Sequence, residues 1–206
     1  MAAKGPQYTY DLTPEIVPVG TNCSTRFVLK LRREPKCDDV RVSRNELVMA
    51  LFLAALLANI AQGLIYFLQL PDPVAAHFNA AGVVNSWMSR RAFVGFKLGV
   101  SFFVAIMVLL PAIALRKTPD AKINLPNKEY WLAPERREET FHYFEAFFLW
   151  FGAATQVLLL DVFHQVFRVN IGLAKTLEHP RASLACYVAF CFVCVAHMLR
   201  RFLRRE

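Results

Sequence analysis

Residues 47–70 read LVMALFLAALLANIAQGLIYFLQL, a run of 24 residues without a charged side chain. An α-helix rises about 1.5 Å per residue, so about 20 apolar residues cross a hydrocarbon core of about 30 Å. Buried helices of soluble proteins are normally shorter and amphipathic, with one polar face. We therefore predict that this window is a transmembrane helix.

Three further windows of the 206-residue chain have the same character. They span residues 92–115, 141–166 and 182–199, and the centre of the second of these three, residues 146–160, is uncharged. Hydrophobic residues make up 56% of the chain and the mean hydropathy is +0.34, whereas soluble domains are about 45–50% apolar. Because lipid offers the backbone no hydrogen-bond partners, helices are favoured. The sequence predicts an all-α integral membrane protein with four transmembrane helices.

The basic residues indicate how these helices are oriented. Outside the four windows, 18 Lys and Arg residues fall on one side of the predicted topology and 5 on the other. Since cytoplasmic segments are enriched in Lys and Arg, we expect both termini to face the cytoplasm. The net charge of +8 would by itself suggest a polyanion, but the basic residues form no single stripe, so we expect no nucleic-acid partner. Lys97, near the outer end of the second helix, is expected to snorkel to the interface.

Residues 1–46 differ from the rest of the chain. Several prolines interrupt any helix, and Phe27, Leu29 and Leu31 alternate with other residues in a pattern typical of a short strand. A segment of this length rarely folds without help. We expect a β-like cytoplasmic extension docked on the four-helix domain of residues 47–206 or on a partner protein.

Two loops carry longer motifs. The outer loop, residues 70–93, reads LPDPVAAHFNAAGVVNSWMSRRAF, and the cytoplasmic loop, residues 123–140, reads INLPNKEYWLAPERREET. Both resemble the domain of unknown function found in bacterial SdpI-like immunity and signal-transduction proteins, over about residues 47–170. The resemblance implies an integral protein of the bacterial inner membrane. The better-known relative, which protects a producing cell from its own toxin, is larger, and Asn85 stands where the family often has Asp.

These motifs supply the candidate contact residues. In the outer loop we predict contacts to a ligand or partner protein by His77, Asn79, Gly82, Asn85 and Trp87. In the cytoplasmic loop we predict anchoring or signalling roles for Asn127, Tyr130, Trp131, Glu135, Arg136 and Arg137. Tyr and Trp also suit membrane interfaces, which is the structural alternative for the aromatic members.

Polar residues within the apolar windows are costly and often mark function. On the third helix, His142, Glu145 and Gln156 share a face, and Asp161 and His164 form an i, i+3 pair. The simplest interpretation is hydrogen bonding between helices. Two alternatives are a divalent-metal site and a proton path. The metal site would use His77, Asp161 and His164, and the path would run from Glu145 through Gln156 to His164.

Familiar catalytic motifs are missing from the sequence. It contains no phosphate-binding loop, no Gly-x-Ser-x-Gly elbow and no His-Glu-x-x-His pair. Gly95 and Gly99 form a Gly-x-x-x-Gly motif that permits close helix contact. The sequence favours a non-enzymatic accessory, sensor or immunity-type protein that needs no cofactor. The alternatives are a metal- or proton-dependent membrane enzyme or transporter, and a structural subunit docked through residues 1–46.

Overall fold

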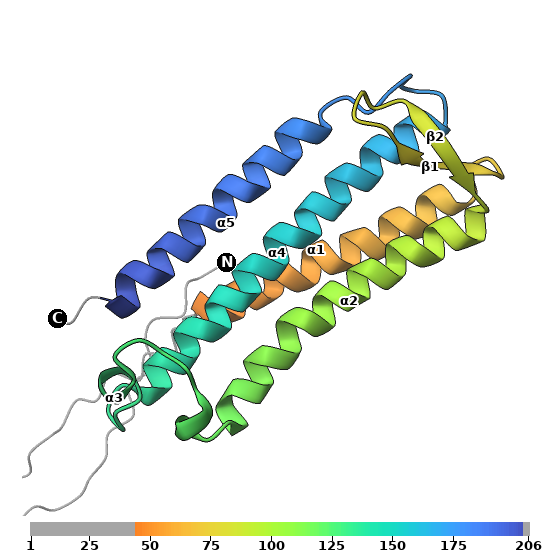
Figure 1. Ribbon diagram of the computed structural model, residues 1–206. Coiled ribbons are helices and arrows are strands. Elements are labelled where there is room, and N and C mark those ends of the chain that lie inside the picture. The colour runs from red at the N-terminus through yellow and green to blue at the C-terminus, as the bar shows by residue number, and fades with distance from the viewer. Residues whose placement is uncertain (1–43, 204–206) are drawn as a thin grey trace, which may run out of the picture. The chain divides into compact units, whose positions relative to one another are not determined.

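The structure is a computed structural model that describes residues 44–203, so the predicted N-terminal strand lies outside the described residues. Four long helices dominate it (Figure 1). They are α1 (Arg44–Phe67), α2 (Arg90–Lys117), α4 (Arg137–Asn170) and α5 (Pro180–Leu203). Each is long and apolar enough to cross a membrane, which confirms the predicted helices. They begin two to four residues before the predicted windows.

Local chemistry explains several of these ends. The Ser89 side chain accepts a hydrogen bond from the Ala92 amide at 3.3 Å and so caps the start of α2. Pro180 occupies the first position of α5, where its missing amide hydrogen costs nothing. Gly172, with a φ of 78°, follows the end of α4 in the left-handed conformation that ends many helices.

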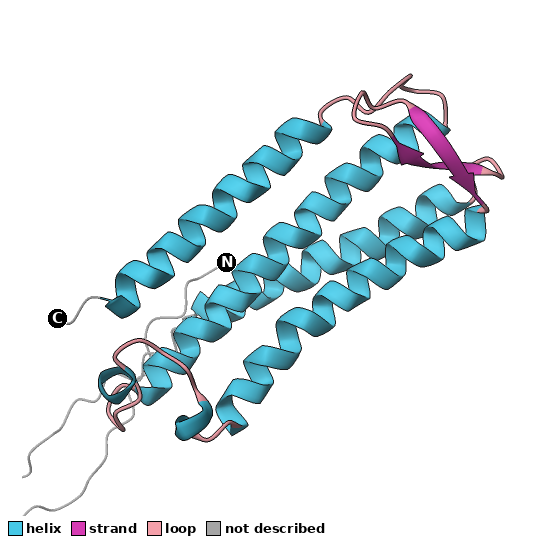
Figure 2. Ribbon diagram, in the orientation of Figure 1, coloured by secondary structure: helices cyan, strands magenta, loops and turns pink. Residues whose placement is uncertain are grey.

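The outer loop contains regular structure that the sequence analysis did not predict. Strands β1 (Val74–Phe78) and β2 (Val84–Met88) pair in antiparallel fashion as a hairpin between α1 and α2 (Figure 2). The pairing register shifts on both sides of His77, so the ladder is irregular there. Two short elements, η1 (Asp120–Lys122) and α3 (Lys128–Trp131), lie in the connection between α2 and α4.

Helix α4 is the centre of the packing. It contacts α1, α2, α5 and strand β1, whereas α5 packs mainly against α4. Many apolar side chains face outward, among them Leu57, Phe103 and Phe192, which are 64%, 61% and 72% exposed. An outward apolar surface on long helices is what a lipid environment requires.

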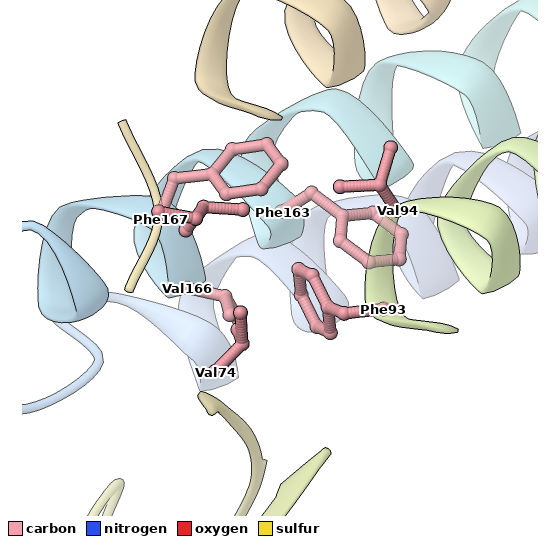
Figure 3. Packing of buried hydrophobic residues seen from close by; sticks show 7 residues of the cluster. Val74, Phe93, Val94, Phe163, Val166 and Phe167 are labelled. Carbon is pink, nitrogen blue, oxygen red and sulfur yellow. The ribbon is translucent and has the colours of Figure 1, made fainter. Parts of the chain in front are cut away.

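Two apolar clusters fill the inside. The cluster beneath the hairpin joins β1, α2 and α4, and most of its members are labelled in Figure 3. It consists of Leu70, Val74, Phe93, Val94, Phe163, Val166 and Phe167. The second cluster lies farther from the hairpin, between α1, α2 and α4. It consists of Val48, Phe52, Ala105, Val108, Leu149 and Ala153.

Candidate functional site

The hairpin is attached to the end of α4 by the side chain of Asn170. Its Oδ1 atom accepts a hydrogen bond from the Ala75 amide at 2.7 Å, and its Nδ2 atom donates to the Ala75 carbonyl at 3.0 Å. One side-chain amide therefore pairs with both backbone groups of a strand residue, as a neighbouring strand would. The hairpin is held in a fixed position against the helices.

The segment between α4 and α5 closes over the hairpin turn. The Leu177 amide donates to the Gly82 carbonyl at 3.3 Å, and Arg181 Nη2 donates to the Ala80 carbonyl at 3.0 Å. Gly82 has a φ of 74°, and a Cβ atom there would lie 3.3 Å from the Leu177 nitrogen. The positive φ favours glycine here, and the close approach of Leu177 leaves little room for a Cβ atom.

Two of the five predicted outer-loop residues therefore build the turn. Asn79 Oδ1 accepts hydrogen bonds from the amides of Ala81 and Val83 at 2.9 and 3.0 Å, and Gly82 supplies the left-handed backbone. The other three predicted residues have exposed side chains on the strands. They are His77, Asn85 and Trp87. Trp87 is 59% exposed, which is unusual for so large an aromatic side chain on a fixed hairpin.

Four polar side chains with no exposed surface lie between the two apolar clusters. This buried polar cluster consists of Asn59 of α1, Lys97 and Ser101 of α2, and Gln156 of α4. Asn59 Nδ2 donates to Gln156 Oε1 at 3.0 Å, and Gln156 Nε2 donates to the Ser101 carbonyl at 2.9 Å. Three helices are thereby joined by hydrogen bonds inside a predicted membrane span.

Lys97 is the charged member of the buried polar cluster. Its Nζ atom donates to the backbone carbonyl of Asn59 at 2.6 Å and to Asn59 Oδ1 at 3.2 Å, and it lies 5.3 Å from the centroid of the Phe163 ring. Within residues 44–203 it forms no ion pair with a carboxylate. The expectation that Lys97 snorkels to the interface is wrong, because the ammonium group finds its hydrogen-bond acceptors inside the helix bundle.

The three predicted metal ligands have separate surroundings. His77 is exposed on β1, Asp161 Oδ2 accepts a hydrogen bond from Ser183 Oγ of α5, and the His164 ring lies 6.3 Å from that of Tyr66 in α1. Across residues 44–203, no group of three or more His, Cys, Asp and Glu side chains is arranged to hold a metal ion. The described structure does not bring His77, Asp161 and His164 together as a site.

Asp161 instead belongs to a latch between α4 and α5. Gln165 Nε2 donates to Asp161 Oδ2 at 2.8 Å and to Ser183 Oγ at 3.3 Å, while Gln165 Oε1 accepts from the His179 amide at 2.9 Å. The first turn of α5 is therefore fixed to α4 by Gln165 together with Asp161. Asp161 and Ser183 also border an apolar groove of about 630 Å³ between α1, α4 and α5.

At the opposite end of the helices, the predicted pair His142 and Glu145 belongs to a charged cluster. Arg116 of α2 contacts Glu145 Oε2 at 3.3 Å, and the His142 Nδ1 to Glu145 Oε2 distance is 3.5 Å. Asn45 of α1 donates to the His142 carbonyl at 3.0 Å. These contacts tie α1, α2 and α4 together. Gln156, predicted to share a face with the pair, has its partners in the buried polar cluster.

The predicted cytoplasmic-loop residues surround the end of α5. Asn127 Nδ2 and Trp131 Nε1 both donate to the Phe202 carbonyl, at 3.0 and 3.3 Å. Arg137 instead pairs with Asp120 at 3.2 Å and stacks on Phe141, while the Glu135 side chain is exposed. The first half of the loop is thus fastened to the end of α5, and its second half is fastened to η1.

A pocket of about 460 Å³ lies where α3, the start of α4 and the end of α5 meet. Its lining combines aromatic and basic side chains. The lining residues are Tyr130, Trp131, Arg136, Glu139, His197, Arg200 and Arg201. The Arg136 guanidinium lies 4.1 Å from the centroid of the Tyr130 ring, and Arg201 pairs with Glu139. We call this the arginine pocket. Sequence analysis predicted three of its members but missed those contributed by α5.

Among the comparisons with known proteins, a family model matches residues 53–99 of the chain. No curated protein and no solved structure matches the chain. The matched family segment covers most of α1, the hairpin and the first third of α2, and so includes both Asn59 and Lys97. Residues 53–99 match the family model described as a domain of unknown function, DUF1648, a small domain commonly found in membrane proteins.

Proposed function

We propose that this chain is a non-enzymatic accessory or sensor protein of the bacterial inner membrane that contacts a partner protein through the exposed face of its hairpin. An immunity-type or signal-transduction role, as in the SdpI-like proteins that the loops resemble, is one form of this proposal. The observation that supports this proposal most strongly is that the hairpin is fixed in place and yet leaves the large aromatic side chain of Trp87 exposed.

Fixation and exposure together support a contact surface. Asn170 pairs with both backbone groups of Ala75, and the α4–α5 connection binds the turn at Gly82. A binding group on a rigid element loses little conformational entropy when it meets its partner. Tryptophan is also enriched among the residues that dominate binding energy at protein interfaces. His77 and Asn85, exposed on the same hairpin, would add polar contacts.

The proposed orientation places both termini in the cytoplasm and the hairpin on the outer side. The support is the unequal distribution of basic residues along the sequence. Alkaline phosphatase, which is active only outside the cytoplasm, tests it. We expect activity from a fusion after Gly82 and none from a fusion after Pro126. The reverse result would overturn the orientation.

Photocrosslinking tests the contact. A photoreactive phenylalanine analogue at Trp87 should give a protein adduct in cells, whereas the same analogue at Leu57, which is exposed on α1, should meet only lipid. A discrete adduct at Trp87 that is lost with a second substitution, Asn85→Arg, would support a partner at the hairpin. If the analogue at Trp87 crosslinks only to lipid and gives no protein adduct, this side chain anchors the chain in the membrane interface. That result would overturn the proposal.

A further inference from the structure

We propose that the arginine pocket binds the phosphate headgroup of an anionic phospholipid. The pocket lies at the opposite end of the helices from the hairpin, so this inference is independent of the function proposed above. It rests on the charges in the pocket, on its aromatic walls and on its position along two membrane-spanning helices.

The charges favour an anion. Three arginines line the pocket and one glutamate opposes them. Glu139 is already paired with Arg201, whose guanidinium also lies 4.6 Å from the Tyr143 ring centroid. Within residues 44–203, neither Arg136 nor Arg200 forms an ion pair. Two guanidinium groups therefore remain available in the pocket, and each can donate two parallel hydrogen bonds to phosphate oxygens.

The pocket is formed before any ligand binds. Trp131 Nε1 donates to the Phe202 carbonyl, and the Trp131 ring lies 5.1 Å from that of Phe202, so the wall contributed by α3 is fixed to α5. Arg136 is held over Tyr130. The volume of about 460 Å³ lies within the range of small-molecule sites and accommodates a phosphoglycerol group. An anion would meet guanidinium groups whose positions are already restricted.

The position along the helices identifies a lipid as the source of the phosphate. Arg200 and Arg201 lie in the last turn of α5, and Glu139 lies in the first turn of α4, where both candidate spans end. Tyr and Trp are typical of this depth. At the same end of α5, Leu199 and Leu203 are 44% and 62% exposed. A lipid with its headgroup in the pocket would have its acyl chains beside an apolar surface, which a free phosphate ion would not use. Basic pockets between transmembrane helices are known sites for anionic lipids.

Native mass spectrometry of the full chain in detergent tests the proposal. Phosphatidylglycerol and the zwitterionic phosphatidylcholine are added separately, and the lipids retained per chain are counted. We expect the wild type to retain phosphatidylglycerol selectively and the double variant R136Q/R200Q to bind it about thirtyfold more weakly. The matched control is Arg168→Gln, because Arg168 pairs with Glu178 at the other end of the helices at 3.1 Å. It should bind like the wild type.

The other outcomes are equally informative. Equal retention of phosphatidylglycerol by the wild type and by R136Q/R200Q would overturn the proposal. Displacement of the lipid by millimolar inorganic phosphate, together with equal affinity for both lipids, would assign the pocket to a soluble phosphate and overturn the lipid assignment. The single variant Arg200→Gln removes an exposed side chain that forms no ion pair in the described chain. It is therefore the control for the case in which the double variant misfolds. It should show an intermediate loss with an unchanged unfolding temperature.

Discussion

The ammonium group of Lys97 in α2 lies 2.6 Å from the backbone carbonyl oxygen of Asn59 in α1 and 3.2 Å from the side-chain oxygen of the same residue. Both residues have no exposed surface. A buried charge is costly unless its hydrogen bonds are satisfied, and one asparagine supplies both oxygens here. The stability of the helix bundle should therefore depend on Asn59 more strongly than on Lys97.

Asn59→Leu should destabilise the protein by about 3 kcal/mol, because it leaves the ammonium of Lys97 with one acceptor fewer in an apolar interior. Lys97→Met, which removes the charge itself, should cost only about 1 kcal/mol. The double variant N59L/K97M should be more stable than N59L. The measurement is the free energy of unfolding in detergent. Simple additivity of the two single changes would contradict this account of Lys97.

Gly152→Ala should destabilise the bundle by about 2 kcal/mol through overpacking. A Cβ atom at Gly152 would lie 2.6 Å from Cγ2 of Val108 and 3.0 Å from Cε2 of Phe52. Val108→Ala in the same chain should recover part of the loss. Gly99→Ala is the matched control, since nothing lies within 4 Å of its Cβ position, and its stability should equal that of the wild type or exceed it by up to about 1 kcal/mol because alanine favours the helix. Thermal unfolding followed by circular dichroism distinguishes the three variants.

Asn170→Leu should release the hairpin without unfolding the helices. The change removes both hydrogen bonds to Ala75, so the Ala75 amide should exchange its hydrogen at least about tenfold faster, a difference of about 1.4 kcal/mol. Hydrogen exchange measured by mass spectrometry over residues 74–88 reports this directly. Asn85→Ala, which changes an exposed residue of β2, should leave the exchange rates as they are. Faster exchange throughout α1 and α2 would mean that Asn170 supports the whole bundle.

Gln165→Leu should loosen the attachment of α5. Gln165 bonds to Asp161, to Ser183 and to the His179 amide, and α5 has few other packing partners within the described chain. We expect faster proteolysis between residues 171 and 179, with α1, α2 and α4 unaffected. Gln69→Leu is the control, because the Gln69 side chain, in the turn after α1, bonds within residues 44–203 only to the Ile65 carbonyl near the end of α1. Equal cleavage of both variants would show that the latch contributes nothing.

The sequence was sufficient for the helices because their signal is local. A run of 24 uncharged residues has few alternatives to a membrane-spanning helix, and each window contains its own evidence. The hairpin was missed because strands β1 and β2 are only five residues long, and the hairpin is held against the helices by Asn170, which lies 95 residues away from Ala75 in the sequence. No local sequence pattern predicts such a contact.

The candidate sites show the same difference between residues with a local sequence signal and contacts between distant segments. Asn79 and Gly82 stood out in the sequence as members of the outer-loop motif and were predicted to contact a ligand or partner, whereas the structure shows both of them building the turn. The arginine pocket could be predicted only in part. Tyr130, Trp131 and Arg136 lie close together in the sequence, but Arg200 and Arg201 come from the last turn of α5. Helix pairing, which a single sequence does not reveal, decides which arginines meet.

The position of α4 has a consequence for genetics. This helix contacts α1, α2, α5 and the hairpin, and its two ends carry Glu139 of the arginine pocket and Asn170 of the hairpin attachment. A substitution that tilts α4 will disturb both membrane surfaces at once, so its phenotype cannot be assigned to either. Variants that separate the activities of the two surfaces should be sought in β2 and in the last turn of α5, where each side chain belongs to one surface alone.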